Sequence, residues 1–129
     1  MSSEATFHYG ATMVPVRDVA QSVDFYVVTL GFTALFHADD DSVAVVHRGP
    51  VYIHLQACDD EEVLRVTADN LAVYVEVSDV DALWKELGKR LSRLPKGRVR
   101  PPFEQEYGMR EFHVKDPDGM LMFFGEPVG

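Results

Sequence analysis

The chain repeats one order of predicted elements, and this repeat limits its possible folds more than any other feature. Val16-Arg17-Asp18-Val19 returns as Val77-Ser78-Asp79-Val80, a shift of 77 − 16 = 61 residues. In each copy a strand pattern precedes these letters, and a helix pattern and three strand patterns follow them. The repeated order of elements is stronger evidence for a duplicated unit than the match of the four-residue segments. It predicts an α+β chain, a single domain over 1–129, with two βαβββ modules (about 8–57 and 69–127) whose curled mixed sheets surround a cleft.

The two predicted helices differ in length. The first is expected over residues 18–31, because an aspartate suits its N-cap and a glycine its C-terminal stop. Leu30-Gly31 returns as Leu87-Gly88 after only 57 residues (87 − 30), so the second helix is expected to be about one turn shorter. The polar stretch 58–69 is expected to be a linker, and residues 1–7 a loose tail.

Alternation along the strands separates side chains that face the core from side chains that face the cleft. In residues 51–56, for example, Ile53 and Leu55 belong to an apolar face, so their neighbours point the other way. The last strand is apolar on both faces, so its assignment rests on position alone. The side chains predicted to face the cleft are Tyr52, His54, Gln56, Ala72, Tyr74, Glu76, Glu111, His113, Leu121 and Phe123.

The predicted cleft is aromatic and acidic and holds two histidines. Aromatic faces stack and attract cations, and carboxylates neutralise them, so this lining favours a small, flat, cationic ligand. The alternative is a wet surface or a dimer contact. The net charge, 12 − 21 = −9, disfavours nucleic acid and anionic membranes as partners and would speed the arrival of a cation. Solubility explains the same charge equally well.

Composition narrows the cellular setting. No apolar stretch is long enough to span a membrane, and the first ten residues lack the basic and apolar regions of a signal peptide. The single cysteine, Cys58, cannot form an internal disulfide, and no catalytic partner can be assigned to it. A cytoplasmic location is therefore expected.

Three stretches resemble a known family: VPVRDVAQSVDFYVVTLGF, ADNLAVYVEVSDVDAL and YGMREFHVKDPDG. They are similar to the vicinal oxygen chelate superfamily, and most of all to its glyoxalase/bleomycin-resistance group. The similarity covers about residues 11–127, and its most specific part is the GMREF, DPDG and FGEP ending. It implies the fold, which hosts lyases, dioxygenases, thiol transferases and drug-sequestering proteins.

The resemblance also implies where a metal would bind. Enzymes of the superfamily carry ligands on the first and last strands of each module, and these positions fall at Ala11, His54, Ala72 and Phe123. Three of the four cannot bind a metal, and a catalytic site needs about three protein ligands. We therefore expect no metal, no cofactor and no catalytic residue. The alternative is a cluster outside the family pattern, made of acceptable ligand types: His54, Glu76, Glu111 and His113.

The resemblance then favours the bleomycin-resistance branch. It implies an acidic, metal-free homodimer that sequesters a cationic, planar-tailed drug in clefts between subunits. Phe32 and Phe36 match a family position that lines the cleft, and Tyr107 stands where drug-binding relatives often have Trp. The sequence thus predicts an aromatic-antibiotic-binding protein without covalent chemistry. Two alternatives stay open: a metal-dependent lyase or dioxygenase, and a protein that acts through its dimer surface alone.

Overall fold

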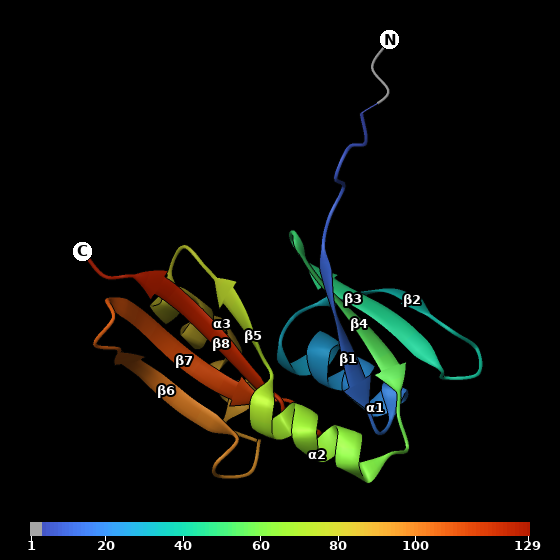
Figure 1. Cartoon of the computed structure of the whole chain (residues 1–129). Helices are drawn as coiled ribbons and strands as arrows, with labels where there is room; N and C mark the ends of the chain where they lie inside the picture. Colours follow the sequence, from blue (N-terminus) through green and yellow to red (C-terminus); the bar gives the residue numbers. More distant parts are fainter. Residues whose placement is uncertain (1–3) are drawn as a thin grey trace.

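The computed structural model describes residues 4–129 and contains the predicted element order twice (Figure 1). The first βαβββ module precedes α2, and the second follows it. The elements are β1 (Ala11–Val16), α1 (Val19–Asp24), the π-helical turn η1 (Phe25–Thr29), β2 (Thr33–His37), β3 (Val43–Arg48), β4 (Val51–Ala57), α2 (Glu61–Asn70), β5 (Ala72–Glu76), α3 (Val80–Leu91), β6 (Val99–Glu104), β7 (Met109–Lys115) and β8 (Leu121–Pro127).

Each module forms its own four-stranded mixed sheet. The orders are β1-β4-β3-β2 and β5-β8-β7-β6, so β1 and β5 are equivalent edge strands. β1 runs parallel to β4, β5 runs parallel to β8, and the remaining pairs are antiparallel. The α+β fold with two βαβββ modules, predicted from the repeat, is confirmed.

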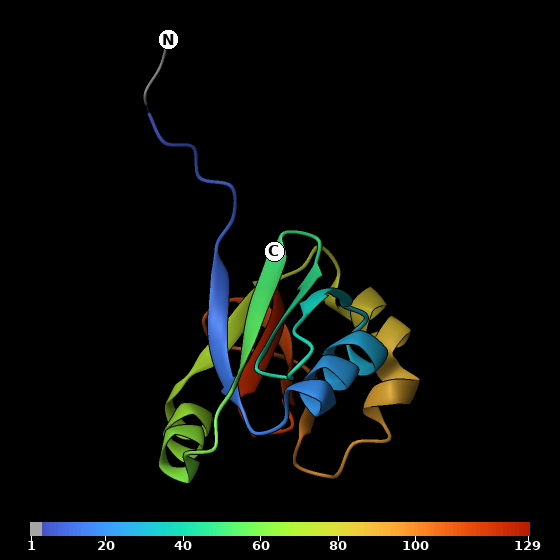
Figure 2. The same ribbon diagram turned by 90° about the vertical axis from the view of Figure 1, so that its right-hand side faces the viewer.

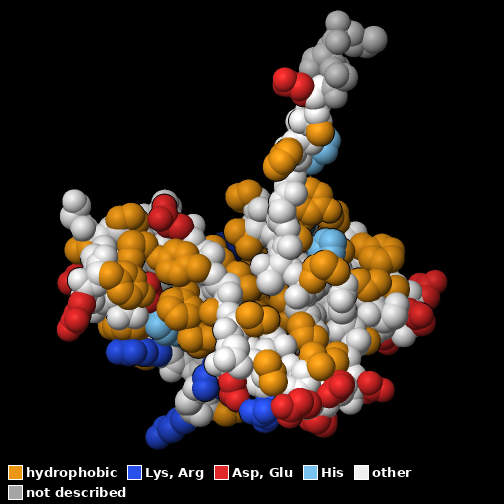
Figure 3. All heavy atoms as spheres, viewed as in Figure 1, with side chains coloured by type: hydrophobic (Ala, Val, Ile, Leu, Met, Phe, Trp, Pro, Cys, Tyr) orange, Lys and Arg blue, Asp and Glu red, His pale blue; other side chains and the backbone are white. Residues whose placement is uncertain are grey.

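The helices α1 and α3 cover the same side of the two sheets, as the rotated view shows (Figure 2). One apolar core lies between helices and sheets and joins both modules; it includes Val14, Tyr26, Ile53, Leu87 and Phe112. The other side of each sheet is largely uncovered, and α2 lies only at its lower end in Figures 1 and 2, next to β1. Apolar side chains gather there over both modules in the space-filling view (Figure 3).

Aspartates begin the two core-covering helices, as the sequence predicts. Asp18 accepts a hydrogen bond from Gln21 N, and Asp79 accepts one from Ala82 N. The expected difference in helix length is wrong, however. α3 continues through Gly88 to Leu91, because the buried side chains of Leu87 and Leu91 anchor its last turn in the core.

The stretch expected to be a polar linker contains the helix α2, so that prediction is wrong. Asp60 caps it by accepting hydrogen bonds from the backbone N–H of Glu62 and Val63. Leu64 and Thr67, three residues apart, supply a narrow buried stripe. A short amphipathic stripe among many charges gives only a weak signal in sequence.

The chain before β1 forms no helix or strand over residues 4–10, and in Figure 1 it leaves the body of the molecule. The rest of the expected tail, residues 1–3, lies outside the described residues, as does the start of the stretch from which a signal peptide was excluded. Within residues 4–129, every helix is too short or too polar to cross a bilayer.

Three arginines join the modules. Arg48 makes a two-pronged ion pair with Glu86 on α3, with both N–O distances at 2.8 Å. Arg90 donates to the carbonyl of Val28 at 2.8 Å. Arg17 donates its backbone N–H to Asp118 at 3.2 Å. These contacts fix the position of one sheet relative to the other.

Candidate functional site

The uncovered face of the second sheet carries a row of aromatic rings. Strand register places Tyr74 on β5 beside Phe123 on β8, and Phe123 beside His113 on β7. The Phe123 ring centroid lies 4.0 Å from that of His113 and 6.0 Å from that of Tyr74. Phe103 on β6 meets His113 edge-on at 5.1 Å. The row spans all four strands and offers a surface on which a flat ligand can stack.

A buried carboxylate lies beside this aromatic row. Glu111 is completely buried and accepts hydrogen bonds from the Tyr107 phenol at 2.5 Å and from Gln105 Nε2 at 3.1 Å. His113 Nε2 lies 2.8 Å from the same carboxylate. Gln105 and Tyr107 both belong to the turn between β6 and β7. Glu111 therefore holds this turn against the sheet.

The same contacts shift two pKa values in opposite directions. Burial raises the pKa of Glu111, but hydrogen bonds from Tyr107, His113 and Gln105 outweigh it, and the net pKa is lowered. The hydrogen bond to Glu111, aided by desolvation, raises the pKa of Tyr107 to about 12. At neutral pH, Glu111 is thus an ionised acceptor and Tyr107 a neutral donor, which is the pairing that their geometry requires.

Gly125 on β8 makes room for the row. A Cβ atom at this position would lie 2.3 Å from the Tyr74 hydroxyl and 3.2 Å from Glu111 Cγ. The Tyr74 ring therefore lies across the glycine backbone, close to the Glu111 side chain. Desolvation and the nearby charges of Glu111 and Glu76 raise the pKa of Tyr74.

The first sheet has a similar uncovered face with a different aromatic group. Tyr52 on β4 is stacked between two rings, with Tyr9 at 4.4 Å and His47 at 5.0 Å. Register places His54 beside Met13 on β1. Its Nε2 atom is buried and has no hydrogen-bond partner among the described residues.

The structure brings together some of the predicted site residues and separates others. Tyr74, Tyr107, Glu111, His113 and Phe123 form one group on the second sheet, as described above. A second group lies on the first sheet and consists of Tyr52, His54 and Gln56.

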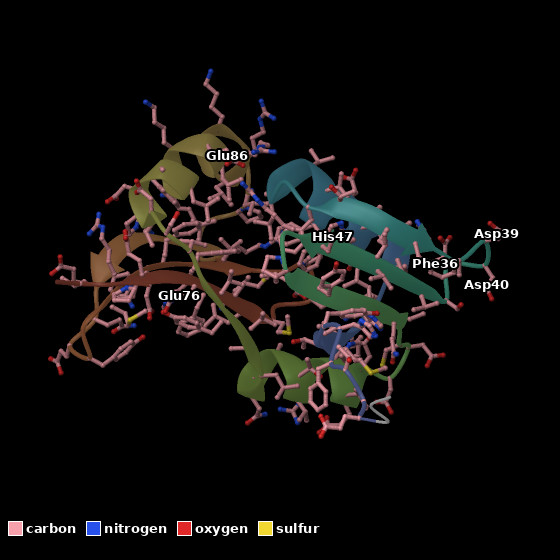
Figure 4. The ribbon with its side chains drawn as sticks, turned by 90° about the horizontal axis from the view of Figure 1, so that it is seen from above. Phe36, Asp39, Asp40, His47, Glu76 and Glu86 are labelled. Carbon is pink, nitrogen blue, oxygen red and sulfur yellow. The ribbon has the colours of Figure 1, made fainter. Side chains whose placement is uncertain are left out.

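Two predicted residues lie elsewhere. Phe32 is buried in the core and is 5% exposed. Phe36 is exposed on β2, beside the turn that carries Asp39 and Asp40 at the far end of the first module (Figure 4). Glu76, toward the other side of that view, is exposed at the end of β5 on the same strand face as Tyr74. One ligand on a single sheet face therefore contacts only part of the predicted set in this chain.

The alternative metal cluster outside the family pattern does not form. Its four residues are divided between the two sheets, with His54 on the first and Glu111 and His113 on the second. Within residues 4–129, the acidic side chains close enough to share an ion are Asp79, Asp81 and Glu126. There Arg110 already pairs with Asp81, and Glu126 accepts a hydrogen bond from Val80 N.

Sequence reasoning missed four residues that take part in the contacts described above on the two uncovered sheet faces: Tyr9, His47, Phe103 and Gln105. His47 had a usable signal, because a tight turn at Gly49-Pro50 pairs it with Tyr52 across the β3–β4 hairpin. Phe103 and Gln105 depend on the irregular pairing of β6 with β7, where the register shifts between Arg100 and Phe103. Tyr9 lies in a stretch without any periodic pattern.

The comparisons with known proteins agree with this fold. The chain is 28% identical to the bleomycin resistance protein of Geobacillus stearothermophilus over 131 aligned residues, covering 89% of this chain and 93% of the relative. Among solved structures it resembles the bleomycin-binding protein from bleomycin-producing Streptomyces verticillus, complexed with copper(II)-bleomycin. That likeness has 31% identity, a TM-score of 0.76, and coverage of 98% of this chain and 99% of that one.

An antibiotic-binding protein from Streptomyces sp. CB03234 is also similar, with 25% identity, a TM-score of 0.72, and coverage of 97% and 99% of the two chains. The family itself matches over residues 8–124, nearly the whole length. This match includes the first module and most of the second, as far as Phe124 in β8. The chain belongs to the Glyoxalase/Bleomycin resistance protein/Dioxygenase superfamily.

Proposed function

We propose that this protein binds and sequesters an aromatic, positively charged antibiotic by non-covalent contacts on its uncovered sheet faces. The observation that carries the proposal is the row Tyr74, Phe123 and His113, with Tyr107 held at its end by buried Glu111. The 31% identity to a bleomycin-binding protein supports the same conclusion. Protection of the host would then follow from binding alone.

The chemistry of the row suits such a ligand. Offset or edge-on stacking on aromatic rings adds about 0.5–1.5 kcal/mol per pair beyond burial. The net charge of −9 favours encounter with a cation. Glu111 contributes indirectly, because its carboxylate is already engaged by three protein groups. Its role in the proposal is to position Tyr107, whose ring is 62% exposed and can stack.

A homodimer is part of the proposal. Both sheets leave one face largely uncovered on the same side of the molecule, and apolar side chains gather there (Figure 3). The exposed large apolar residues of the chain include Met13, Tyr74 and Tyr107. Extended apolar patches on soluble proteins mark interaction surfaces. A second copy placed on this side would convert two open faces into enclosed clefts. We also propose a cytoplasmic location, which the single cysteine supports.

The direct test is calorimetric titration of the purified protein with metal-free bleomycin and with copper(II)-bleomycin, alongside light scattering to measure the oligomeric state. We expect saturable binding by a dimer. Tyr107→Ala should weaken binding about three- to tenfold, the equivalent of one lost ring contact. The matched control is Val63→Ala, which truncates an exposed side chain on α2 and should bind normally. The same pair should differ in protecting a bleomycin-sensitive bacterial host.

Two outcomes would overturn the proposal. The first is the absence of binding to either form of the drug and to a panel of other flat cationic antibiotics. The second is a stoichiometric divalent metal in protein purified without chelator, together with turnover of a substrate that disappears on chelation. That result would establish the metal-dependent enzyme, the alternative that the sequence left open.

A further inference from the structure

A cavity of about 480 Å³ lies between the two modules, apart from the aromatic row. Its apolar walls come from both halves of the chain: Leu30 and Phe32 from the first module, Val75 and Phe124 from the second. All four side chains are buried. Cavities that bind small molecules typically measure about 300–1,000 Å³ and have mostly apolar walls. Size and lining both fall within that class.

An ion pair between the modules forms one side of this cavity. Arg48 pairs with Glu86 and also donates to the carbonyl of Leu30 at 3.0 Å. The contact depends on Gly31, whose φ is +77°, because a Cβ there would lie 2.8 Å from Arg48 Nη1. The charge of Arg48 is thus matched by Glu86 in a partly exposed ion pair, and its hydrogen-bonding capacity is largely engaged.

The free edge of β5 forms the opposite side. Val77 donates its N–H to the carbonyl of Gly125, at 2.8 Å, so this group points toward β8. Backbone groups of successive strand residues point in opposite directions, and the N–H and C=O of Glu76 therefore point away from β8, toward the free edge. Glu76 lines the cavity with this edge backbone, because its side chain lies on the same strand face as Tyr74, opposite the buried Val75.

The charged residues that line the cavity indicate which kind of ligand it would bind. Glu86 is matched by Arg48, whereas Asp79 at the rim forms no ion pair with any residue in 4–129. We propose that this cavity between the modules is a second binding site, for a small aromatic amine. The ring would lie against Phe32, Val75 and Phe124, and the ammonium group would face Asp79. The edge backbone of Glu76 offers one further donor and one further acceptor.

This site is independent of the proposed antibiotic site. Its walls include none of the aromatic row and neither Tyr107 nor Glu111. Because the walls come from both modules, a bound ligand would also add contacts across the junction that Arg48 and Glu86 already bridge. Binding should therefore raise the melting temperature of the whole chain, since it favours the state in which both modules are folded and docked.

The test uses tryptamine as the probe, with backbone amide chemical shifts followed by NMR on the full chain. We expect shifts at Gly49, Val77, Ser78 and Ala82 on the walls, saturating in the high micromolar to millimolar range. Indole-3-acetate, which has the same ring but a negative charge, should bind more weakly. Asp79→Ser, which removes the charge and keeps an oxygen for the N-cap of α3, should weaken tryptamine about two- to fivefold, as for a partly exposed ion pair.

Two further variants test whether the response comes from the cavity. Ala82 lies on the wall and is exposed on α3, so Ala82→Phe should fold normally and remove the response. Tyr107→Ala should leave it unchanged. The proposal is wrong if tryptamine perturbs only amides of the aromatic row, if indole-3-acetate binds equally well, or if no saturable shift occurs at the wall. None of these results depends on whether the protein binds bleomycin.

Discussion

The Tyr107 phenol donates a 2.5 Å hydrogen bond to Glu111, which joins one of the more exposed rings of the molecule to one of its few fully buried carboxylates. A ring that is 62% exposed would ordinarily sample several rotamers. Here its hydroxyl has a fixed partner inside the sheet, so the ring starts from a defined position. Such pre-ordering lowers the entropy that a ligand must remove on binding.

Loss of the Glu111 acceptor should destabilise the chain. Glu111→Leu leaves the donors of Tyr107, Gln105 and His113 without their partner and should lower the unfolding free energy by about 2–4 kcal/mol. Glu111→Gln keeps an acceptor oxygen and should cost less than half as much. Urea unfolding of both variants and the wild type measures the difference. Equal stability of Glu111→Leu and the wild type would contradict this account.

Asp116 should make stability depend on pH. Its Oδ1 accepts from the N–H of Asp118 at 2.9 Å and of Met120 at 2.8 Å, and burial raises its pKa from 3.8 to about 6. The folded chain therefore holds this proton more tightly than the unfolded chain does. The contribution of Asp116 to the unfolding free energy falls as pH rises from about 4 to 6, and it is constant outside that window.

Asp116→Asn keeps the Oδ1 acceptor and removes the titration. Relative to the wild type, its unfolding free energy should increase by about 1–3 kcal/mol as pH rises through the same window. The variant must be compared with the wild type, because the lowered pKa values of Glu61, Asp81 and Glu86 make the unfolding free energy of both proteins rise with pH. Only the difference between the two proteins isolates Asp116. Urea unfolding at a series of pH values measures it. A stability difference that stays constant with pH would rule out the assigned burial effect.

Two glycines should respond oppositely to alanine. Gly31 ends the first helical segment with φ at +77°, and a Cβ would meet Arg48, so Gly31→Ala should cost about 1–2 kcal/mol. Gly88 lies inside α3 with nothing within 4 Å of its Cβ position. Gly88→Ala should instead stabilise the chain by about 0.5–1 kcal/mol. Thermal unfolding of both variants measures whether each substitution stabilises or destabilises the chain. If both changes have the same direction, local context overrides the backbone effect.

Gly125 and Tyr74 should be energetically coupled. A Cβ at position 125 would displace the Tyr74 ring, whose hydroxyl would lie 2.3 Å away. Gly125→Ala should therefore cost about 1 kcal/mol in the wild type and less in a Tyr74→Ala background. A double-mutant cycle by urea unfolding measures the coupling. Strict additivity of the two changes would mean that the neighbouring Glu111, rather than Tyr74, causes the strain.

The sequence was most informative where the pattern is local and periodic. Strand alternation placed Glu111 and His113 on the face opposite Phe112, and register confirms that these two lie in line with Gly125 and Phe123. It failed at α2, because the many charged residues around its narrow buried stripe made the stretch resemble a polar linker. It also misjudged the relative lengths of the two helices, because the repeated Leu-Gly pair does not mark the end of α3, which continues through Gly88 to Leu91.

The amino-acid order by itself determined the two βαβββ modules, the caps Asp18 and Asp79, and the membership of each strand face, because these depend on neighbours a few residues apart. Only the tertiary structure decided that Phe32 lies in the core, that Tyr107 is tied to Glu111, and that the modules enclose a cavity bridged by an ion pair. Those facts depend on how two sheets are placed relative to each other. Contacts between residues far apart in the chain fix that placement, and no short pattern encodes it.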